Sequence, residues 1–148
     1  MNLANKRLLK VMWIPDTRII FDMRNENQLE LSSDVYNKLN KYINLENWMS
    51  EYSREYHNWL NDKSDTIYDI NFSVNKNMIE AIKKTNKILV DEVLYYWFDV
   101  DRTFAEDFNW ELCPRTHKKL LELMNDYNSN NRLISPDEYL VFPSNLKN

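Results

Sequence analysis

The sequence predicts a single α+β domain, and three observations carry this prediction. The chain has 148 residues, a length typical of one domain, with 43% hydrophobic and 28% charged residues, as in globular proteins. Residues 34–60 place an apolar side chain at every third or fourth position, which indicates amphipathic helix. Residues 93–98 read VLYYWF, which indicates a strand with two apolar faces.

The N-terminal half is expected to form a β-hairpin followed by helices. Residues 7–14 (RLLKVMWI) and 18–23 (RIIFDM) read as two strands joined by a turn at Pro15 and Asp16. The helical region that follows is expected to break into two helices near residues 44–46, where Asn-Leu-Glu interrupts the apolar pattern.

A third helix is expected after a polar connection over residues 61–71. Asn75 is the candidate N-cap, because an asparagine side chain can accept a hydrogen bond from a free N–H of the first turn. The inner face of this helix is predicted to carry Met78, Ile79, Ile82 and Leu89. The strand at residues 93–98 comes next and is predicted to be central, because both of its faces are apolar.

The C-terminal third is expected to be mostly helical. Residues 103–111 read as a short helix, and Pro114 suits the first turn of another helix that runs to about residue 127. Residues 135–138 (SPDE) look like a capped helical turn, and residues 139–142 read as a last short strand.

Composition excludes several classes of protein. Glycine is absent, so phosphate loops, dinucleotide turns and nucleophile elbows in their usual form are absent too. We expect asparagine, present 21 times, to take over the left-handed turn positions. The only cysteine, Cys113, excludes an intramolecular disulfide. A pI near 5.2 argues against nucleic acid as a direct ligand.

Nothing near the N-terminus resembles a targeting or membrane segment. The short apolar run of residues 11–14 is followed at once by Pro15 and Asp16, so it is neither a signal-peptide core nor a membrane span. We therefore expect a cytoplasmic protein that does not associate with membranes.

The string VLYYWFDVDRTF contains the sharpest enzyme-like pattern. An apolar strand followed by Asp-x-Asp-x-Thr resembles the first motif of haloacid-dehalogenase-type phosphotransferases. The resemblance would make Asp99 the nucleophile and Asp101 the acid/base, with Mg²⁺ bridging. The pattern departs from the family because Arg102 stands where glycine is usual and because only 45 residues follow Thr103. The favoured interpretation is two solvated carboxylates at the end of a strand, with no catalytic residue, metal or cofactor.

Other polar residues have structural interpretations. Cys113 and His117 could face each other across one helical turn, yet no further metal ligand is in reach, and a structural cysteine is favoured. Lys118 and its neighbours are expected to form a solvated face that complements acids elsewhere. The stripe Trp48, Tyr52, Tyr56 and Trp59 is expected to be core, with exposure of one ring as an interface anchor the alternative.

Residues 91–111 (DEVLYYWFDVDRTFAEDFNWE) concentrate acidic and aromatic side chains. They hold seven carboxylates, seven aromatic rings and one base, so they carry −6 in a chain whose net charge is −4. Such a surface would steer and anchor a basic partner, although ordinary acidic loops around a buried strand are the alternative. The predicted partner-binding residues are Asp91, Glu92, Asp99, Asp101, Glu106, Asp107, Phe108, Trp110 and Glu111.

The fragments LLKVMWIPDTRIIFDM, LELSSDVYNKL and MIEAIKKTNKILVDEVLYYWF resemble those of small bacterial α+β proteins. In general character the chain resembles a bacterial immunity protein, the class that blocks a cognate toxin in contact-dependent inhibition and related competition systems. The resemblance implies neutralisation of a basic toxin, most naturally a nuclease, in a 1:1 heterodimer. The alternatives are a phage or mobile-element inhibitor of a host nucleic-acid enzyme, a small Mg²⁺-dependent phosphotransferase using Asp99 and Asp101, and a self-assembling subunit.

Overall fold

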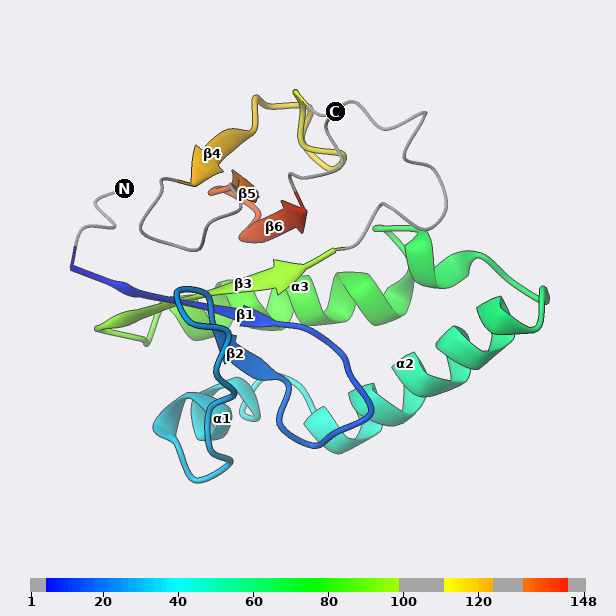
Figure 1. The fold of residues 1–148 in the computed structure, drawn as a ribbon, viewed down its shortest axis with the longest axis horizontal. Helices are drawn as coiled ribbons and strands as arrows, with labels where there is room; N and C mark the ends of the chain where they lie inside the picture. Colours follow the sequence, from blue (N-terminus) through cyan, green and yellow to red (C-terminus); the bar gives the residue numbers. More distant parts are fainter. Residues whose placement is uncertain (1–4, 99–110, 124–131, 144–148) are drawn as a thin grey trace.

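The computed structural model describes residues 5–98, 111–123 and 132–143. In these ranges the chain forms one mixed sheet with helices packed against one of its faces (Figure 1). The order across the sheet is β2-β1-β3-β6-β5-β4. The strands are β1 (Arg7–Val11), β2 (Ile20–Asp22), β3 (Glu92–Trp97), β4 (Leu121–Leu123), β5 (Arg132–Ser135) and β6 (Leu140–Pro143).

The sheet confirms the predicted hairpin and the predicted central strand. β1 and β2 pair antiparallel, with Lys10 opposite Phe21. β3 lies between β1 and β6 and runs parallel to both, while β4 and β5 complete the sheet in antiparallel order. Side chains pack on both faces of β3, which explains why the strand is apolar on both sides.

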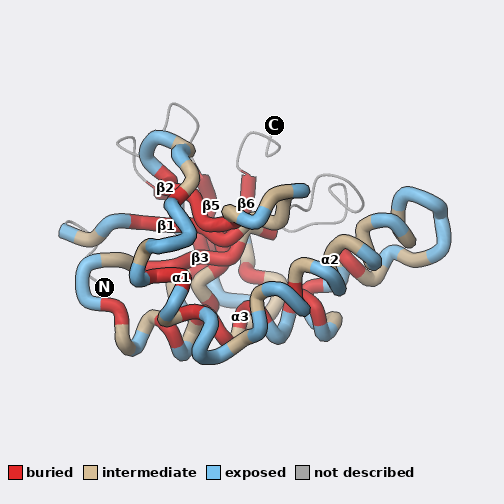
Figure 2. Tube along the Cα trace, turned by 90° about the horizontal axis from the view of Figure 1, so that it is seen from below, coloured by how far each residue is buried: buried red, intermediate tan, exposed pale blue. Residues whose placement is uncertain are grey.

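The helical region divides as predicted into α1 (Asp34–Leu39) and α2 (Leu45–Leu60). The side chain of Asn44 caps α2 by accepting a hydrogen bond from the backbone N–H of Asn47 at 3.0 Å. A short 3₁₀ helix, η1 (Thr66–Tyr68), follows within the polar connection. Figures 1 and 2 both show the last turns of α2 extending past the sheet.

The third helix, α3 (Ser73–Asn86), exists, but its predicted N-cap is wrong. Phe72 occupies the N-cap position, and Asn75 lies inside the helix with 1% of its surface exposed. Its amide group donates to the carbonyl oxygens of Ile67 at 2.9 Å and Asp69 at 2.8 Å, and its Oδ1 accepts from the Tyr96 hydroxyl at 2.6 Å. Asn75 thus joins α3 to η1 and to β3.

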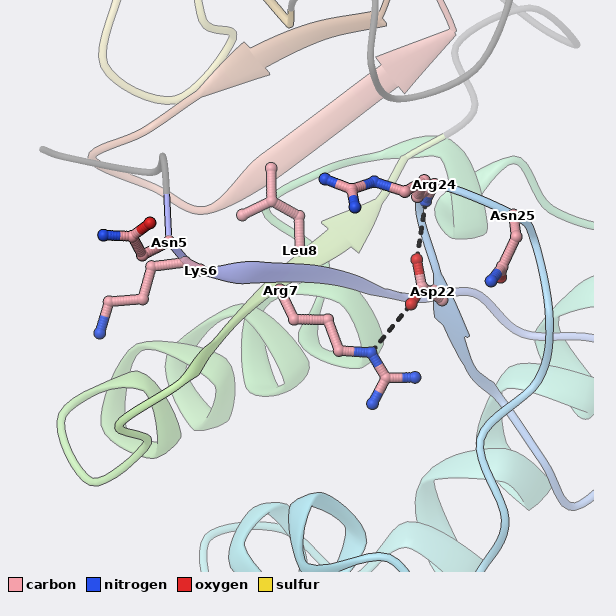
Figure 3. Close-up of a pocket in the computed structure, with 7 residues that line it drawn as sticks. All are labelled: Asn5, Lys6, Arg7, Leu8, Asp22, Arg24 and Asn25. Atoms are coloured by element: carbon pink, nitrogen blue, oxygen red, sulfur yellow. Dashed lines mark hydrogen bonds and ion pairs between the residues drawn. The ribbon is translucent and has the colours of Figure 1, made fainter.

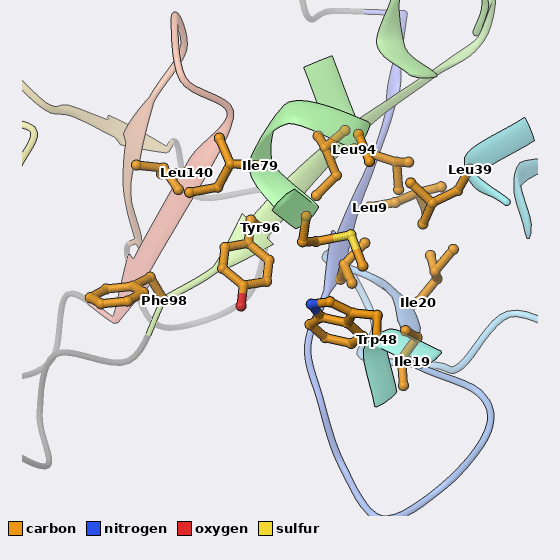
Figure 4. Packing of buried hydrophobic residues seen from close by; sticks show 14 of the residues in the cluster. Leu9, Ile19, Ile20, Leu39, Trp48, Ile79, Leu94, Tyr96, Phe98 and Leu140 are labelled. Atoms are coloured by element: carbon orange, nitrogen blue, oxygen red, sulfur yellow. The ribbon is translucent and has the colours of Figure 1, made fainter. Parts of the chain in front are cut away.

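The main core lies between the helices and the sheet, where Figure 4 shows the rings of Trp48, Tyr96 and Phe98 among aliphatic side chains. The predicted inner face of α3 is confirmed for Met78, Ile79 and Ile82, which are fully buried, whereas Leu89 is buried but lies beyond the end of the helix at Asn86. A smaller cluster on the opposite sheet face consists of Leu8, Met23, Val93, Tyr95, Leu123, Ile134 and Val141. In Figure 2 the strands form the buried centre, and the outer sides of α2 and α3 are exposed.

The helix expected at residues 114–127 is wrong over its described part, residues 114–123. The chain forms a turn there, closed by hydrogen bonds from Cys113 N–H to Lys118 O at 2.7 Å and from Leu120 N–H to Glu111 O at 2.8 Å. It then enters β4, which pairs with β5. The turn signal at Pro114 suits a helix start and a tight turn equally, and pairing with β5 decided between them.

Two further expectations need correction or confirmation near the C-terminus. Residues 136–139 form the turn between β5 and β6, in place of a capped helical turn, and the last strand is confirmed as β6. In the described ranges the residues with positive φ are Glu26, Asp62, His117 and Tyr139. None is asparagine, so the expectation that asparagine replaces glycine at left-handed positions is wrong there.

Candidate partner-binding surface

Of the nine residues predicted to bind a partner, the structure describes three, and these three lie at two separate places. Asp91 is exposed just before β3, Glu92 is half-buried at its first position, and Glu111 is exposed in the turn before β4. Figure 1 draws the start of β3 and the turn at residues 111–120 on opposite sides of the molecule. Asp99, Asp101, Glu106, Asp107, Phe108 and Trp110 lie outside the described residues.

The carboxylates at the start of β3 have basic neighbours. The pKa of Lys38 is raised, first by its hydrogen bond with Asp34 and then by the nearby charges of Glu92 and Asp91. The ammonium group of Lys6 donates to the carbonyl oxygen of Val90. The surroundings of Asp91 and Glu92 are therefore of mixed charge, and partner binding by residues 91–111 stays a prediction.

A second group of aromatic side chains surrounds Trp13, in the loop between β1 and β2. The ring of Trp13 stacks on Tyr52 with centroids 5.1 Å apart and packs on Tyr56 at 5.2 Å. Tyr52 and Tyr56 are four residues apart in α2, so both project from the same side of the helix. The loop after β1 is thus held against α2 by three rings.

These rings continue along α2 in both directions. Trp48 lies 5.3 Å from Tyr52 at one end, and Trp59 lies 5.9 Å from Tyr56 at the other. Only Trp48 is buried, with 2% of its surface exposed, while the other three rings of the stripe are half-buried. The prediction of a core stripe is therefore right for Trp48 and partly right for Tyr52, which is half-buried and packs against the main core. It is wrong for Tyr56 and Trp59, which are half-buried outside that core.

One face of α2 and the loop after β1 enclose a hollow of about 620 Å³, which we call the α2 groove. The helix contributes positions on one of its faces, and the loop contributes residues 13–17. The lining residues are Trp13, Ile14, Pro15, Asp16, Thr17, Glu46, Met49, Ser50, Ser53, Tyr56 and His57. The lining combines rings and aliphatic groups with hydroxyl, imidazole and carboxylate groups.

The charges lining the α2 groove are acidic. Hydrogen bonding to the backbone N–H of Arg18, at 3.0 Å, is the largest effect that lowers the pKa of Asp16, and the Arg18 guanidinium lies 3.5 Å from the same carboxylate. Glu46 is exposed in the first turn of α2. Asp16 is thus an ionised carboxylate at neutral pH, partly balanced by Arg18.

A second hollow of about 320 Å³, the ring pocket, adjoins the α2 groove at Trp13. It shares Trp13, Ile14, Pro15 and Tyr56 with the α2 groove. Its further lining residues are Met12, Tyr52, Tyr68 and Trp97.

Trp97 also belongs to a buried charge cluster. Lys10 and Arg132 place their cationic groups 4.4 and 4.9 Å from the centre of the Trp97 ring. Both contact the carboxylate of Glu26, and for Lys10 the distance is 2.8 Å. Burial is the largest effect on the pKa of Lys10 and lowers it, and burial also lowers the pKa of Arg132. Two cations thus share one carboxylate and one indole ring.

A third hollow, of about 430 Å³, lies at the start of β1 (Figure 3). Its basic residues are Lys6, Arg7 and Arg24. Arg7 pairs through Nε with Asp22 at 2.8 Å, and the same carboxylate accepts the backbone N–H of Arg24 at 2.8 Å. Figure 3 shows Arg7 and Arg24 on opposite sides of β1 and Lys6 pointing away from both, so these cations do not converge on a common point.

The remaining candidate residues have structural surroundings. Cys113 is buried in the main core and His117 is exposed at a positive φ of 62°, so they do not share a helix face. Arg115 contacts Glu80 at 3.6 Å, and Lys118 contacts Asp137 at 3.0 Å. The expectation that Lys118 complements an acid elsewhere is thereby confirmed.

Neither a metal cluster nor a spanning helix occurs in the described ranges. Residues 5–98, 111–123 and 132–143 contain no group of three or more histidine, cysteine or acidic side chains placed to hold a metal ion. No helix in this part of the chain combines the length and apolar character required to cross a bilayer. No family model matches the chain, and no similar protein was found among curated proteins or solved structures.

Proposed function

We propose that this protein is an inhibitor of the bacterial immunity type, which binds and neutralises a basic toxin, with a nuclease as the expected partner. The observation that carries the proposal is the α2 groove, where Trp13, Met49 and Tyr56 lie beside two carboxylates. Large apolar side chains next to charged groups are the usual composition of a protein interface, in which a few aromatic anchors provide most of the affinity.

The charge of the α2 groove selects the kind of partner. Asp16 and Glu46 line it, and Glu51 and Glu55 add further acid to α2, where Arg54 is the one basic residue apart from His57. Negative charge beside half-buried rings favours a partner segment rich in lysine and arginine, whose side chains pack on aromatic rings and pair with carboxylates. A toxin that binds nucleic acid carries such a basic surface.

The acid-rich residues 91–111 would be a second contact in this proposal. Their net charge of −6 is larger than that of any part of the α2 groove, and it would accelerate encounter with a basic partner. The groove would then provide the apolar anchors, and residues 91–111 would provide steering that weakens with added salt.

The experiment is a pull-down from the native host with tagged protein, together with the product of the adjacent upstream gene. We expect a basic protein in a salt-sensitive 1:1 complex. Ser53→Arg places a long cation in the α2 groove and is expected to weaken binding at least about tenfold, since a like charge opposes the partner. Asn58→Arg adds the same charge to α2 outside both hollows and is the matched control.

Three outcomes separate the parts of the proposal. Failure to capture any basic protein at low salt contradicts the inhibitor function itself. Equal affinity of the Ser53→Arg and Asn58→Arg variants contradicts docking in the α2 groove. Unchanged association rates for the triple variant Asp101→Asn, Asp107→Asn and Glu111→Gln contradict steering by residues 91–111.

A further inference from the structure

The ring pocket occupies a place in the sheet where ligands often bind. Met12 to Pro15 follow the last residue of β1, and Trp97 is the last residue of β3. β1 and β3 are parallel neighbours, so the pocket lies beyond their carboxyl ends. In sheets with parallel strands, ligands characteristically bind outside these ends, because the loops that follow the strands can diverge and leave a crevice.

The walls of the ring pocket are aromatic, and neighbouring rings support them. Trp13, Tyr52, Tyr56, Tyr68 and Trp97 all line it, and all five are half-buried. Trp59 packs against Tyr68 at 5.1 Å, and Trp13 packs against both Tyr52 and Tyr56. Side chains held in this way are pre-organised, so a ligand would lose little affinity to ordering them.

The chemistry of the lining favours an uncharged ligand. The described residues around this pocket include no charged side chain, so an ion would leave water without gaining a partner there. Two cations, Lys10 and Arg132, already lie against the ring of Trp97 and would repel a further cation. Aromatic rings and tyrosine hydroxyls suit a flat ring system that stacks and accepts or donates one or two hydrogen bonds.

We propose that the ring pocket binds a small, flat, uncharged aromatic molecule of the size of a nucleobase or an indole. The volume of about 320 Å³ is at the lower end of the range for small-molecule sites, roughly 300–1,000 Å³, which limits the ligand to one or two fused rings with a small substituent. The ring pocket shares four lining residues with the α2 groove, but Met12, Tyr68 and Trp97 line only the ring pocket, so variants at these positions test the two proposals separately.

The test is a titration followed by NMR of the tryptophan indole N–H signals, with adenosine and indole as probes and cyclohexanol as the non-aromatic control. We expect the signals of Trp13 and Trp97 to shift together and saturate, with a Kd between about 10 μM and 10 mM for ligands of this size. The signal of Trp48 is expected to stay in place, because its indole N–H donates to Val74 O at 2.9 Å in the core.

Two variants locate the binding. Tyr68→Leu keeps an apolar contact with Trp59 and removes one stacking wall, and it is expected to weaken adenosine binding about 5- to 150-fold. Met12→Arg places a charge in the pocket and is expected to abolish binding. This variant is a second test that does not depend on whether Tyr68→Leu keeps the fold. Ser53 lines the α2 groove but not the ring pocket, so the Ser53→Arg variant should bind the probes as the wild type does.

The proposal is overturned if neither aromatic probe shifts the Trp13 and Trp97 signals with a Kd of about 10 mM or below, the weakest affinity expected. It is also overturned if cyclohexanol gives the same shifts, or if Met12→Arg, checked for folding by its indole spectrum, binds adenosine unchanged. If Met12→Arg loses probe binding but still captures the partner, the inhibitor proposal stands. If Ser53→Arg loses partner capture but still binds the probes, the ring-pocket proposal stands.

Discussion

Replacing Asn75 should cost more stability than any other polar substitution on the exposed or buried face of α3. The Asn75 side chain makes three hydrogen bonds, two to carbonyl oxygens near η1 and one from the Tyr96 hydroxyl. Burial raises the pKa of Tyr96 well above its ordinary value of 10.0, so its hydroxyl remains a donor throughout the accessible pH range. Asn75→Ala removes all three bonds at once.

The size of the stability loss in Asn75→Ala depends on which of the three hydrogen-bond partners stay buried without access to water. Asp69 is exposed, so its carbonyl can be solvated, whereas the Ile67 carbonyl bond and the Tyr96 hydroxyl bond are buried. An unsatisfied buried polar group costs about 1–3 kcal/mol, so two of them predict a loss of about 3 kcal/mol in the free energy of unfolding. Tyr96→Phe leaves only Asn75 Oδ1 without its donor and should cost about 1–2 kcal/mol.

The assay is urea unfolding followed by tryptophan fluorescence, with the m-value required to stay constant. Asn77→Ala makes the same chemical change at an exposed position of α3 and should alter stability by less than about 0.5 kcal/mol. The double variant Asn75→Ala, Tyr96→Phe should lose about 1 kcal/mol less stability than the sum of the two single losses, because both substitutions remove the same hydrogen bond. A loss below about 1 kcal/mol for Asn75→Ala would refute the reasoning.

Two other substitutions test the backbone and the buried charges. Asp62→Gly should raise the free energy of unfolding by about 1 kcal/mol, because Asp62 has a φ of 57° just after α2. Glycine is unstrained at such a φ, and it removes an acid that opposes the helix dipole. Thermal unfolding at pH 7 measures this effect, and a lower melting temperature would contradict it. Because burial lowers the pKa of Lys10 below its ordinary 10.5, the unfolded chain binds more protons, and stability should rise as pH increases through the folded pKa towards 10.5. Lys10→Met should remove this rise and change stability at pH 7 by less than about 1 kcal/mol, because Glu26 keeps Arg132 as its partner. Urea unfolding at several pH values compares the two proteins, and an unaltered dependence of stability on pH would count against the interpretation.

Several elements were predictable from the sequence because their signals are local. The break before α2 follows from Asn44, whose side chain caps the next helix. The central position of β3 follows from its two apolar faces. The helix expected at residues 114–127 failed because Pro114 is compatible with a turn as well, and the pairing partner in β5 lies beyond the reach of any local pattern.

The candidate surface was only partly predictable for the same reason. The aromatic stripe of α2 is visible as a three-to-four spacing, but its exposure depends on what covers it. Trp13 was expected to continue a strand, and its stacking on Tyr52 arises only when the loop after β1 folds against α2. Residues 91–111 stand out by charge, yet the fold places their two ends apart (Figure 1).

By itself, the sequence determined the α+β class, the hairpin, the helices α1 to α3 and the central strand, because side-chain periodicity and capping act over a few neighbouring residues. The tertiary structure alone decided which rings meet around Trp13, why Asn75 is buried in α3 and how Lys10, Glu26 and Arg132 come to share one site. These contacts join residues from distant parts of the chain, and they form only when the sheet brings β1, β3 and β5 together with the helices on one face.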